Sequence, residues 1–179
     1  GMGTTDVGML IEGDIMAVAH VGDSRAYRLR DGKFELLTQD HTWVNEQVVA
    51  GFLTEEQARV HPLKNVVTRA LGGDSEVEVD VREWPVQVGD LFLICSDGVW
   101  EPLGHRELHR LLALYDDPEA AARALVRMAL ERGGQDNASA LVVHVDAVGG
   151  ADGLFALRSA RDLPLPGRLA PGARLDGFV

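Results

Sequence analysis

Apolar and polar residues alternate through much of the first half of the chain, which is typical of β-strands. Apolar runs flank Glu12-Gly13-Asp14 and Asp31-Gly32. Both spacers favour tight turns, so each pair of runs predicts a β-hairpin. The alternation EVEVDVREW, residues 76–84, predicts a half-exposed strand, whereas the continuous run LFLIC, residues 91–95, predicts a fully buried one. ASALVVHVDA, residues 138–147, predicts a last strand.

Two short helices are predicted between residues 40 and 60. Val44, Gln47 and Val48 recur with helical spacing. Thr54 followed by Gln57 matches a capping box and predicts the start of the second helix. Pro62 ends that pattern.

Two longer helices are predicted after the buried strand. The first has a single apolar face, made of Leu108, Leu111, Leu112 and Tyr115. The second begins with Asp117 as N-cap and Pro118 in the first turn, and Gly133-Gly134 ends it. Short strands combined with helices predict an α+β fold of layers, with antiparallel sheets.

Composition and charge restrict the function. The chain has 179 residues, 46% of them hydrophobic, which is enough for one domain with a core. The net charge of −11 argues against a binder of nucleic acid or anionic membranes, because both need a basic face. We see no signal peptide and no apolar run of the ~18 residues needed for a membrane span. The single cysteine, Cys95, fits a cytoplasmic location.

Three aspartates lie at predicted strand ends. Asp23 and Asp97 each follow an apolar run, and Asp136 precedes one. Asp97 is expected at a loop tip. If the three strand ends share one rim of a sheet, the carboxylates converge, and they then need a hard cation such as Mg²⁺ or Mn²⁺. Alternatively, each Asp is an ordinary turn residue.

Four segments occur in one order along the chain: VAHVGDSRAYRLRDGKFELLTQDHT, NVVTRALGG, GDLFLICSDGVWEPL and GGQDNASALVV. Together they resemble the metal-dependent protein serine/threonine phosphatases of type 2C, the PPM family, in its bacterial form. The resemblance covers residues 3 to about 145. It implies a β-sandwich of antiparallel sheets flanked by helices, and hydrolysis of phosphoserine and phosphothreonine by a metal-activated water.

The resemblance also assigns roles to the aspartates. Asp97 and Asp136 are expected to bind two core Mg²⁺ or Mn²⁺ ions, with Gly98 and Asn137 supporting the metal loops. Asp23 is expected to bind a third, weaker ion together with Asp97.

The same resemblance divides the chain into parts. Residues 1–147 are expected to form a partial PPM-type domain, and residues 148–179 a Gly-, Pro- and Arg-rich extension. Residues 40–73, which begin with Asp40, His41 and Thr42, resemble the flap that shapes substrate access beside the active site. The implied partners are phosphorylated proteins or a serine/threonine kinase in a signalling pathway.

The chain departs from the family at its start. The family motif D-G-x-G-G, which precedes GTT in family members, does not occur in this sequence. The resemblance then implies that the bridging Asp, the phosphate-binding Arg and the general-acid His are absent, so no catalytic residue is assigned beyond the metal site. We expect weak binding of the core metals and impaired turnover, and self-association across the exposed sheet or its coverage by the tail. The alternative function is a non-catalytic pseudophosphatase that binds phosphoproteins or kinases.

Other residues allow two interpretations each. Cys95 is either a nucleophile or, as we favour, a buried strand residue. His20 and His41 are either general acids or structural histidines. Trp100, like Trp43, either lines a peptide groove or packs in the structure, and Arg25 either binds phosphate or orders nearby groups.

Overall fold

The computed structural model describes residues 3–73, 76–134 and 136–149. The expected extension therefore lies outside the described residues except for its first two positions. In chain order the elements are β1 Asp6–Glu12, β2 Ile15–Val21, β3 Arg25–Arg30, β4 Lys33–Leu36, α1 Trp43–Val49, α2 Glu55–Arg59, β5 Asp80–Pro85, β6 Leu91–Cys95, α3 Asp97–Leu114, α4 Pro118–Glu131 and β7 Ala140–His144.

Both predicted hairpins are present. β1 and β2 pair in antiparallel fashion around Gly13, which has a φ of 60°. β3 and β4 pair around Asp31 and Gly32, whose φ values are 50° and 76°. Positive φ at both positions is what a tight hairpin turn with this sequence requires.

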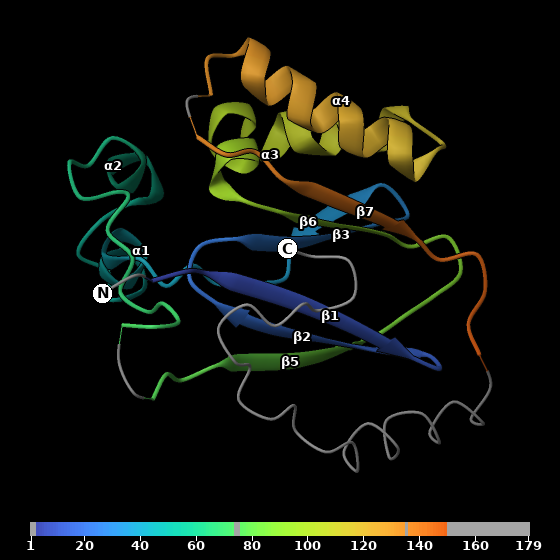
Figure 1. Cartoon of the computed structure of the whole chain (residues 1–179), viewed down its shortest axis with the longest axis horizontal. Helices are drawn as coiled ribbons and strands as arrows, with labels where there is room; N and C mark the ends of the chain where they lie inside the picture. Colours follow the sequence, from blue (N-terminus) through green and yellow to red (C-terminus); the bar gives the residue numbers. More distant parts are fainter. Residues whose placement is uncertain (1–2, 74–75, 135, 150–179) are drawn as a thin grey trace, which may run out of the picture.

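The strands form two antiparallel sheets, one with the order β1-β2-β5 and one with the order β4-β3-β6-β7. The sheets face each other, and α3 and α4 cover the outer face of the four-stranded sheet (Figure 1). α1 and α2 lie at one end of the sandwich (Figure 1). The α+β fold with helices flanking an antiparallel sandwich is therefore confirmed.

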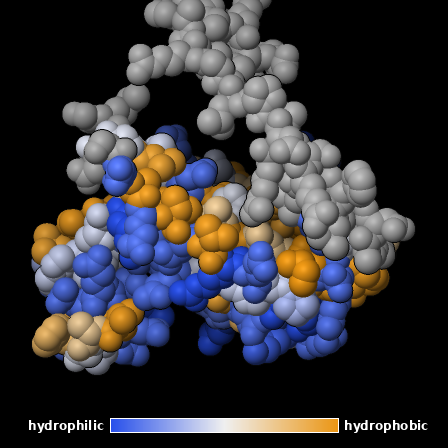
Figure 2. Space-filling view, turned by 90° about the horizontal axis from the view of Figure 1, so that it is seen from below, coloured by the Kyte–Doolittle hydropathy of each residue, from blue (hydrophilic) through white to orange (hydrophobic). Residues whose placement is uncertain are grey.

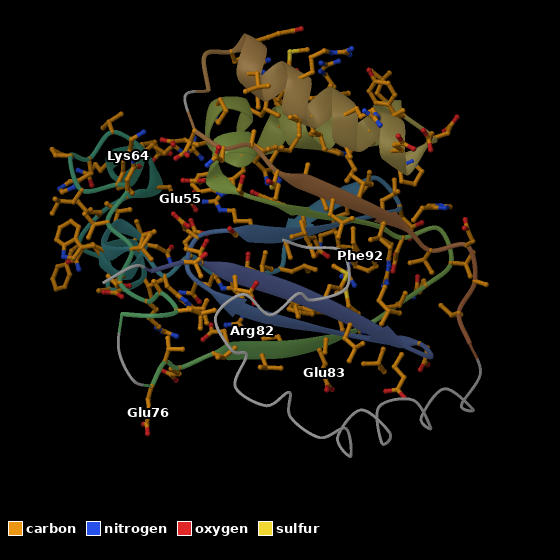
Figure 3. The ribbon with its side chains drawn as sticks, viewed as in Figure 1. Glu55, Lys64, Glu76, Arg82, Glu83 and Phe92 are labelled. Atoms are coloured by element: carbon orange, nitrogen blue, oxygen red, sulfur yellow. The ribbon has the colours of Figure 1, made fainter. Side chains whose placement is uncertain are left out.

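β6 is buried on both of its faces, as its continuous apolar sequence predicts. Phe92 packs into the core between the two sheets, and Leu93 packs into the core beneath α3 and α4. Phe92 is visible between the sheets in Figure 3. Both side chains are 0% exposed. β6 thus contributes side chains to both hydrophobic cores.

Two predicted boundaries were wrong. The predicted strand at 76–84 begins only at Asp80, because its partner β2 pairs with it only from His20 to Ile15. Asp97 does not lie at a loop tip: it is the first residue of α3, with Ser96 as N-cap. The helix starts there because the chain turns directly out of β6, and the Gly104 kink separates this first turn from the later apolar pattern.

The helices with clear capping signals begin as predicted. Thr54 and Gln57 form the capping box of α2, and Asp117 caps α4 through the amide of Ala120. Among the described residues, no helix has both the length and the apolar character that crossing a bilayer requires.

Candidate metal centre

The three predicted aspartates come from adjacent parts of one sheet end. Asp23 lies in the link from β2 to β3, Asp97 follows β6, and Asp136 precedes β7. In the four-stranded sheet Arg25 pairs with Cys95, and Cys95 pairs with Ala140. The start of β3, the end of β6 and the start of β7 therefore lie side by side, and the chain segments that carry the aspartates leave from the same rim.

Ser96 connects the loops of Asp97 and Asp136. Its hydroxyl donates to the carbonyl of Asn137 at 3.0 Å and accepts from the amide of Ser139 at 3.1 Å. The backbone amide of Ser96 donates to the carbonyl of Ser139, also at 3.1 Å. These bonds fix the first turn of α3 against the loop that precedes β7.

Gly98 allows a close approach at the same place. A Cβ atom at this position would lie 2.5 Å from the carbonyl oxygen of Asn137. Only glycine fits there without a shift of the backbone. Gly98 and the carbonyl group of Asn137 are thus in contact. Their role in supporting metal loops stays a prediction.

The pKa values of Asp97 and Asp23 are both raised. Burial raises the pKa of Asp97, and the nearby carboxylates of Asp136 and Glu101 raise it further. Burial also raises the pKa of Asp23, to about 6, with additional contributions from Asp97 and Asp40. Partly buried carboxylates that repel one another are stabilised by a cation, so the electrostatics of this rim fit a hard divalent ion.

The described side chains do not form a closed cage of ligands. Within residues 3–73, 76–134 and 136–149, no group of three or more His, Cys, Asp or Glu side chains is close enough to hold an ion. Asp97 instead interacts electrostatically with Asp23 and with Asp136. Mg²⁺ commonly keeps several waters and takes only one or two carboxylates, so this donor set suits Mg²⁺ or Mn²⁺.

The backbone around Asp23 is tightly held. The indole Nε1 of Trp100 donates to the carbonyl of Asp23 at 2.9 Å. Gly22 has a φ of 108°, and a Cβ there would lie 2.2 Å from Cγ2 of Thr5. No local sequence signal predicts the Trp100 contact, because 77 residues separate the partners.

Arg25 is engaged in the structure and is not free to bind phosphate. Its Nε and Nη2 donate to the two carboxylate oxygens of Asp40 at 2.9 and 2.7 Å. The guanidinium carbon lies 3.5 Å from the ring centroid of Trp100. These contacts favour the interpretation that Arg25 orders its neighbours, and they place Trp100 in the packing around Asp23.

The expected flap, residues 40–73, contains α1 and α2. It lies at the end of the sandwich where β6 leads into α3 (Figure 1). Thr42 caps α1 through the amide of Asn45 and forms a bridge with Val67, which joins the two ends of the flap. Lys64, labelled in Figure 3, forms an ion pair with Glu101 in the first turn of α3. The flap is therefore attached to the helix that carries Asp97.

The remaining candidates are buried. His20 and His41 are 2% and 4% exposed, with ring centroids 4.7 Å apart, which favours structural roles over general acid catalysis. Cys95 lies in the core beneath α3 and α4. Burial raises the pKa of its thiol to about 12, which is incompatible with a reactive thiolate.

Comparisons with known proteins agree on one family. The family model described as Protein phosphatase 2C matches residues 1–138. The serine/threonine protein phosphatase PstP of Mycobacterium tuberculosis is 39% identical over 145 residues, which are 81% of this chain and 28% of PstP. The serine/threonine phosphatase stp of Listeria monocytogenes is 37% identical over 146 residues, 82% of this chain and 58% of that protein.

Solved structures agree with the sequence matches. The catalytic domain of PstP in complex with two manganese ions has a TM-score of 0.73 and 37% identity, and the match covers 82% of this chain and 60% of that domain. The present chain thus spans between about a quarter and three fifths of these relatives.

Proposed function

The chain belongs to the protein phosphatase 2C family, and we propose on that premise that it forms part of a metal-dependent phosphatase acting on phosphoserine and phosphothreonine in proteins. The observation that carries the proposal is that the segments bearing Asp23, Asp97 and Asp136 leave the same rim of the four-stranded sheet. The raised pKa values of Asp23 and Asp97 agree with this proximity. Two named relatives are serine/threonine phosphatases, and the catalytic domain of one of them binds two manganese ions.

Each residue has a distinct role in this proposal. Asp97 and Asp136 would hold the more strongly bound Mg²⁺ or Mn²⁺, and Asp97 with Asp23 a weaker one. Bound divalent ions supply an activated water and neutralise charge on the phosphoryl oxygens. Gly98 keeps α3 close to the Asn137 loop, and Trp100 holds the Asp23 backbone, so both set the spacing of the carboxylates.

A test uses Mn²⁺-dependent hydrolysis of a phosphothreonine peptide and of p-nitrophenyl phosphate by this chain. Asp97→Asn is compared with Asp116→Asn, which changes an exposed carboxylate outside the site. Hydrolysis that requires Mn²⁺, persists in Asp116→Asn and is lost in Asp97→Asn supports the proposal. Equal hydrolysis by both variants contradicts it.

A second candidate function is a non-catalytic module that binds phosphoproteins or a kinase. It is favoured by the described donor set, which contains no three-residue ligand group. Mn²⁺ binding that is lost in Asp97→Asn, in a chain that binds phosphothreonine peptide without hydrolysing it, would select this alternative. The phosphorylated protein is the partner in both cases, and the buried free Cys95 supports a cytoplasmic setting for either.

We also propose that isolated copies of the chain associate through the open side of the sandwich. Among the described residues, β1 and β7 are edge strands of the two sheets, and the groove between the sheets there has a volume of about 450 Å³. It is lined by Val7, Gly8, Met9, Ile11, Ile94, Leu141 and Val143. Figure 2 shows further hydrophobic surface on the side seen from below. Free strand edges beside apolar surface favour pairing with another chain.

Analytical ultracentrifugation tests this association. A concentration-dependent dimer that dissociates in Leu141→Lys supports it, because a charge placed in the groove disfavours burial. A monomer at all concentrations contradicts it.

A further inference from the structure

We propose that His41 is a positioning residue that holds the backbone of Gly22 and Asp23 and ties it to both ends of the flap. The proposal rests on the proposed function in one respect: it assumes that Asp23 is a metal ligand. The contacts that support it stand independently of catalysis.

His41 binds both backbone groups of the residue that precedes Asp23. Its amide donates to the carbonyl of Gly22 at 2.8 Å, and its ring Nδ1 accepts from the amide of Gly22 at 3.1 Å. Trp100 binds the carbonyl of Asp23 itself. Three of the four backbone N–H and C=O groups of Gly22 and Asp23 are therefore bound to side chains or backbone from other segments.

The tautomer of His41 follows from these bonds. Nδ1 accepts a hydrogen bond, so in the neutral ring the proton is on Nε2. Nε2 lies 3.4 Å from Oδ2 of Asp80, longer than an ordinary hydrogen bond but close enough for the carboxylate to favour that proton position. Asp80 is itself bound by Arg69, whose Nη1 donates to Oδ1 at 3.0 Å.

The ring has no room to turn. Its side chain is 4% exposed, and His20 packs against it. A role for His41 as a metal ligand does not fit, because the Gly22 amide occupies Nδ1 and Nε2 faces Asp80. A fixed, neutral ring is instead suited to holding a backbone segment in place.

His41 also lies where the flap begins and returns. The amide of Thr68 donates to the carbonyl of His41 at 2.8 Å, and the amide of Trp43 donates to the carbonyl of Val66 at 2.9 Å. Arg69, one residue further, reaches Asp80. A displacement of either end of the flap is thereby transmitted to Gly22 and to the position of the Asp23 carboxylate.

The test compares two substitutions of His41 with a matched control. His41→Leu removes the acceptor for the Gly22 amide, whereas His41→Asn offers an oxygen close to the position of Nδ1. His144→Leu changes a partly exposed histidine that contacts Asp146, outside the site. Amide hydrogen exchange is measured in the metal-free chain, and Mn²⁺ affinity is measured by electron paramagnetic resonance.

We expect His41→Leu to speed exchange at Gly22 and Thr68 at least tenfold and to weaken Mn²⁺ binding five- to twentyfold. His41→Asn should keep the exchange rates and the Mn²⁺ affinity within about threefold of the wild type. His144→Leu should have the same values as the wild type. In an Asp23→Asn background, His41→Leu should no longer change Mn²⁺ affinity, because its effect acts through Asp23.

Three results for His41→Leu would overturn the proposal. The first is an unchanged exchange rate at the Gly22 amide, and the second is faster exchange at Gly22 with an unchanged rate at Thr68. The third is an unchanged Mn²⁺ affinity although exchange is faster at both amides. If the wild-type chain binds no Mn²⁺, the proposed function fails. The exchange rates at Gly22 and Thr68 then test alone whether His41 attaches the Gly22–Asp23 backbone to the flap. If His41→Leu does not fold, His41→Phe replaces it as the variant without an acceptor, because its ring keeps the packing against His20.

Discussion

Trp100 and Asp23 are 77 residues apart in sequence, yet the indole Nε1 of Trp100 donates a 2.9 Å hydrogen bond to the backbone carbonyl of Asp23. Trp100 lies in the first turn of α3, and Asp23 lies in the link between the two sheets. The contact therefore joins α3, which begins with Asp97, to the loop that carries Asp23.

Trp100→Phe tests this contact. The substitution keeps an aromatic face for Arg25 but leaves the Asp23 carbonyl without its donor, so we expect a loss of about 1–3 kcal/mol in the free energy of unfolding and weaker Mn²⁺ binding. Trp84→Phe, in the packing around the core between the sheets, serves as the control. Urea denaturation and Mn²⁺ titration measure both effects; an unchanged Mn²⁺ affinity in Trp100→Phe would show that this bond does not position Asp23.

Gly22→Ala tests the close approach beside Asp23. The added Cβ meets Thr5 and requires an unfavourable positive φ, so we expect a loss of about 3 kcal/mol or more in the free energy of unfolding. Gly32→Ala isolates the φ effect, because Gly32 has a φ of 76° and no atom within 4 Å of an added Cβ. We expect about 1 kcal/mol there. Equal losses in the two variants would show that the loop near Thr5 relaxes freely.

Asp97→Asn should have opposite effects with and without metal. Burial and nearby carboxylates raise the pKa of Asp97, which means that the fold disfavours its charge, so the neutral variant should be more stable than the wild type in metal-free buffer. Mn²⁺ should raise the melting temperature of the wild type and not that of the variant. Melting curves with Mn²⁺ and with a chelator check this, with Asp116→Asn expected to behave as the wild type. A metal-free variant less stable than the wild type contradicts the repulsion that we infer.

His20 should make stability depend on pH. Burial lowers its pKa below 6.5, and neither ring nitrogen has a hydrogen-bond partner within the described part of the chain. The unfolded chain then takes up the proton more readily, so the contribution of neutral His20 is complete above pH 6.5 and is lost as the pH falls through its lowered value.

His20→Phe removes this titration. We expect similar stability of variant and wild type near pH 8, and a growing advantage of the variant below pH 6.5. Chemical denaturation at several pH values measures the difference. Parallel pH profiles for the two proteins would show that His20 is not the group responsible.

The sequence predicts local structure correctly where a residue determines the backbone conformation of residues close to it in sequence. Gly13, Asp31 and Gly32 supply turns, and Thr54 and Asp117 supply caps, and all of these are found in place. The continuous apolar run of residues 91–95 also predicts that β6 is buried on both faces. These signals involve residues a few positions apart, which is why one sequence is enough to read them.

The candidate site is predicted only in part for the same reason. Asp23, Asp97 and Asp136 can be selected as polar residues at strand ends, but their arrangement depends on which strands pair. Neither the contact of Trp100 with Asp23 nor that of Asp80 with His41 follows from any local pattern, because each joins distant segments. The prediction that Asp97 lies at a loop tip was wrong for a related reason: the helix that begins there is held by the contact of Gly98 with Asn137, a residue distant in sequence.

The link that carries Asp23 crosses from the three-stranded to the four-stranded sheet, whereas Asp97 and Asp136 both adjoin strands of the four-stranded sheet. The spacing of Asp97 and Asp136 is therefore set by hydrogen bonds within one sheet. The spacing of Asp97 and Asp23 depends on the Trp100 hydrogen bond to the Asp23 carbonyl and on the packing between the two sheets, which includes Met16 and Phe92. In the proposed metal site, the packing between the sheets would thereby influence the distance from Asp23 to Asp97, and so the size of the ion that these two carboxylates can share.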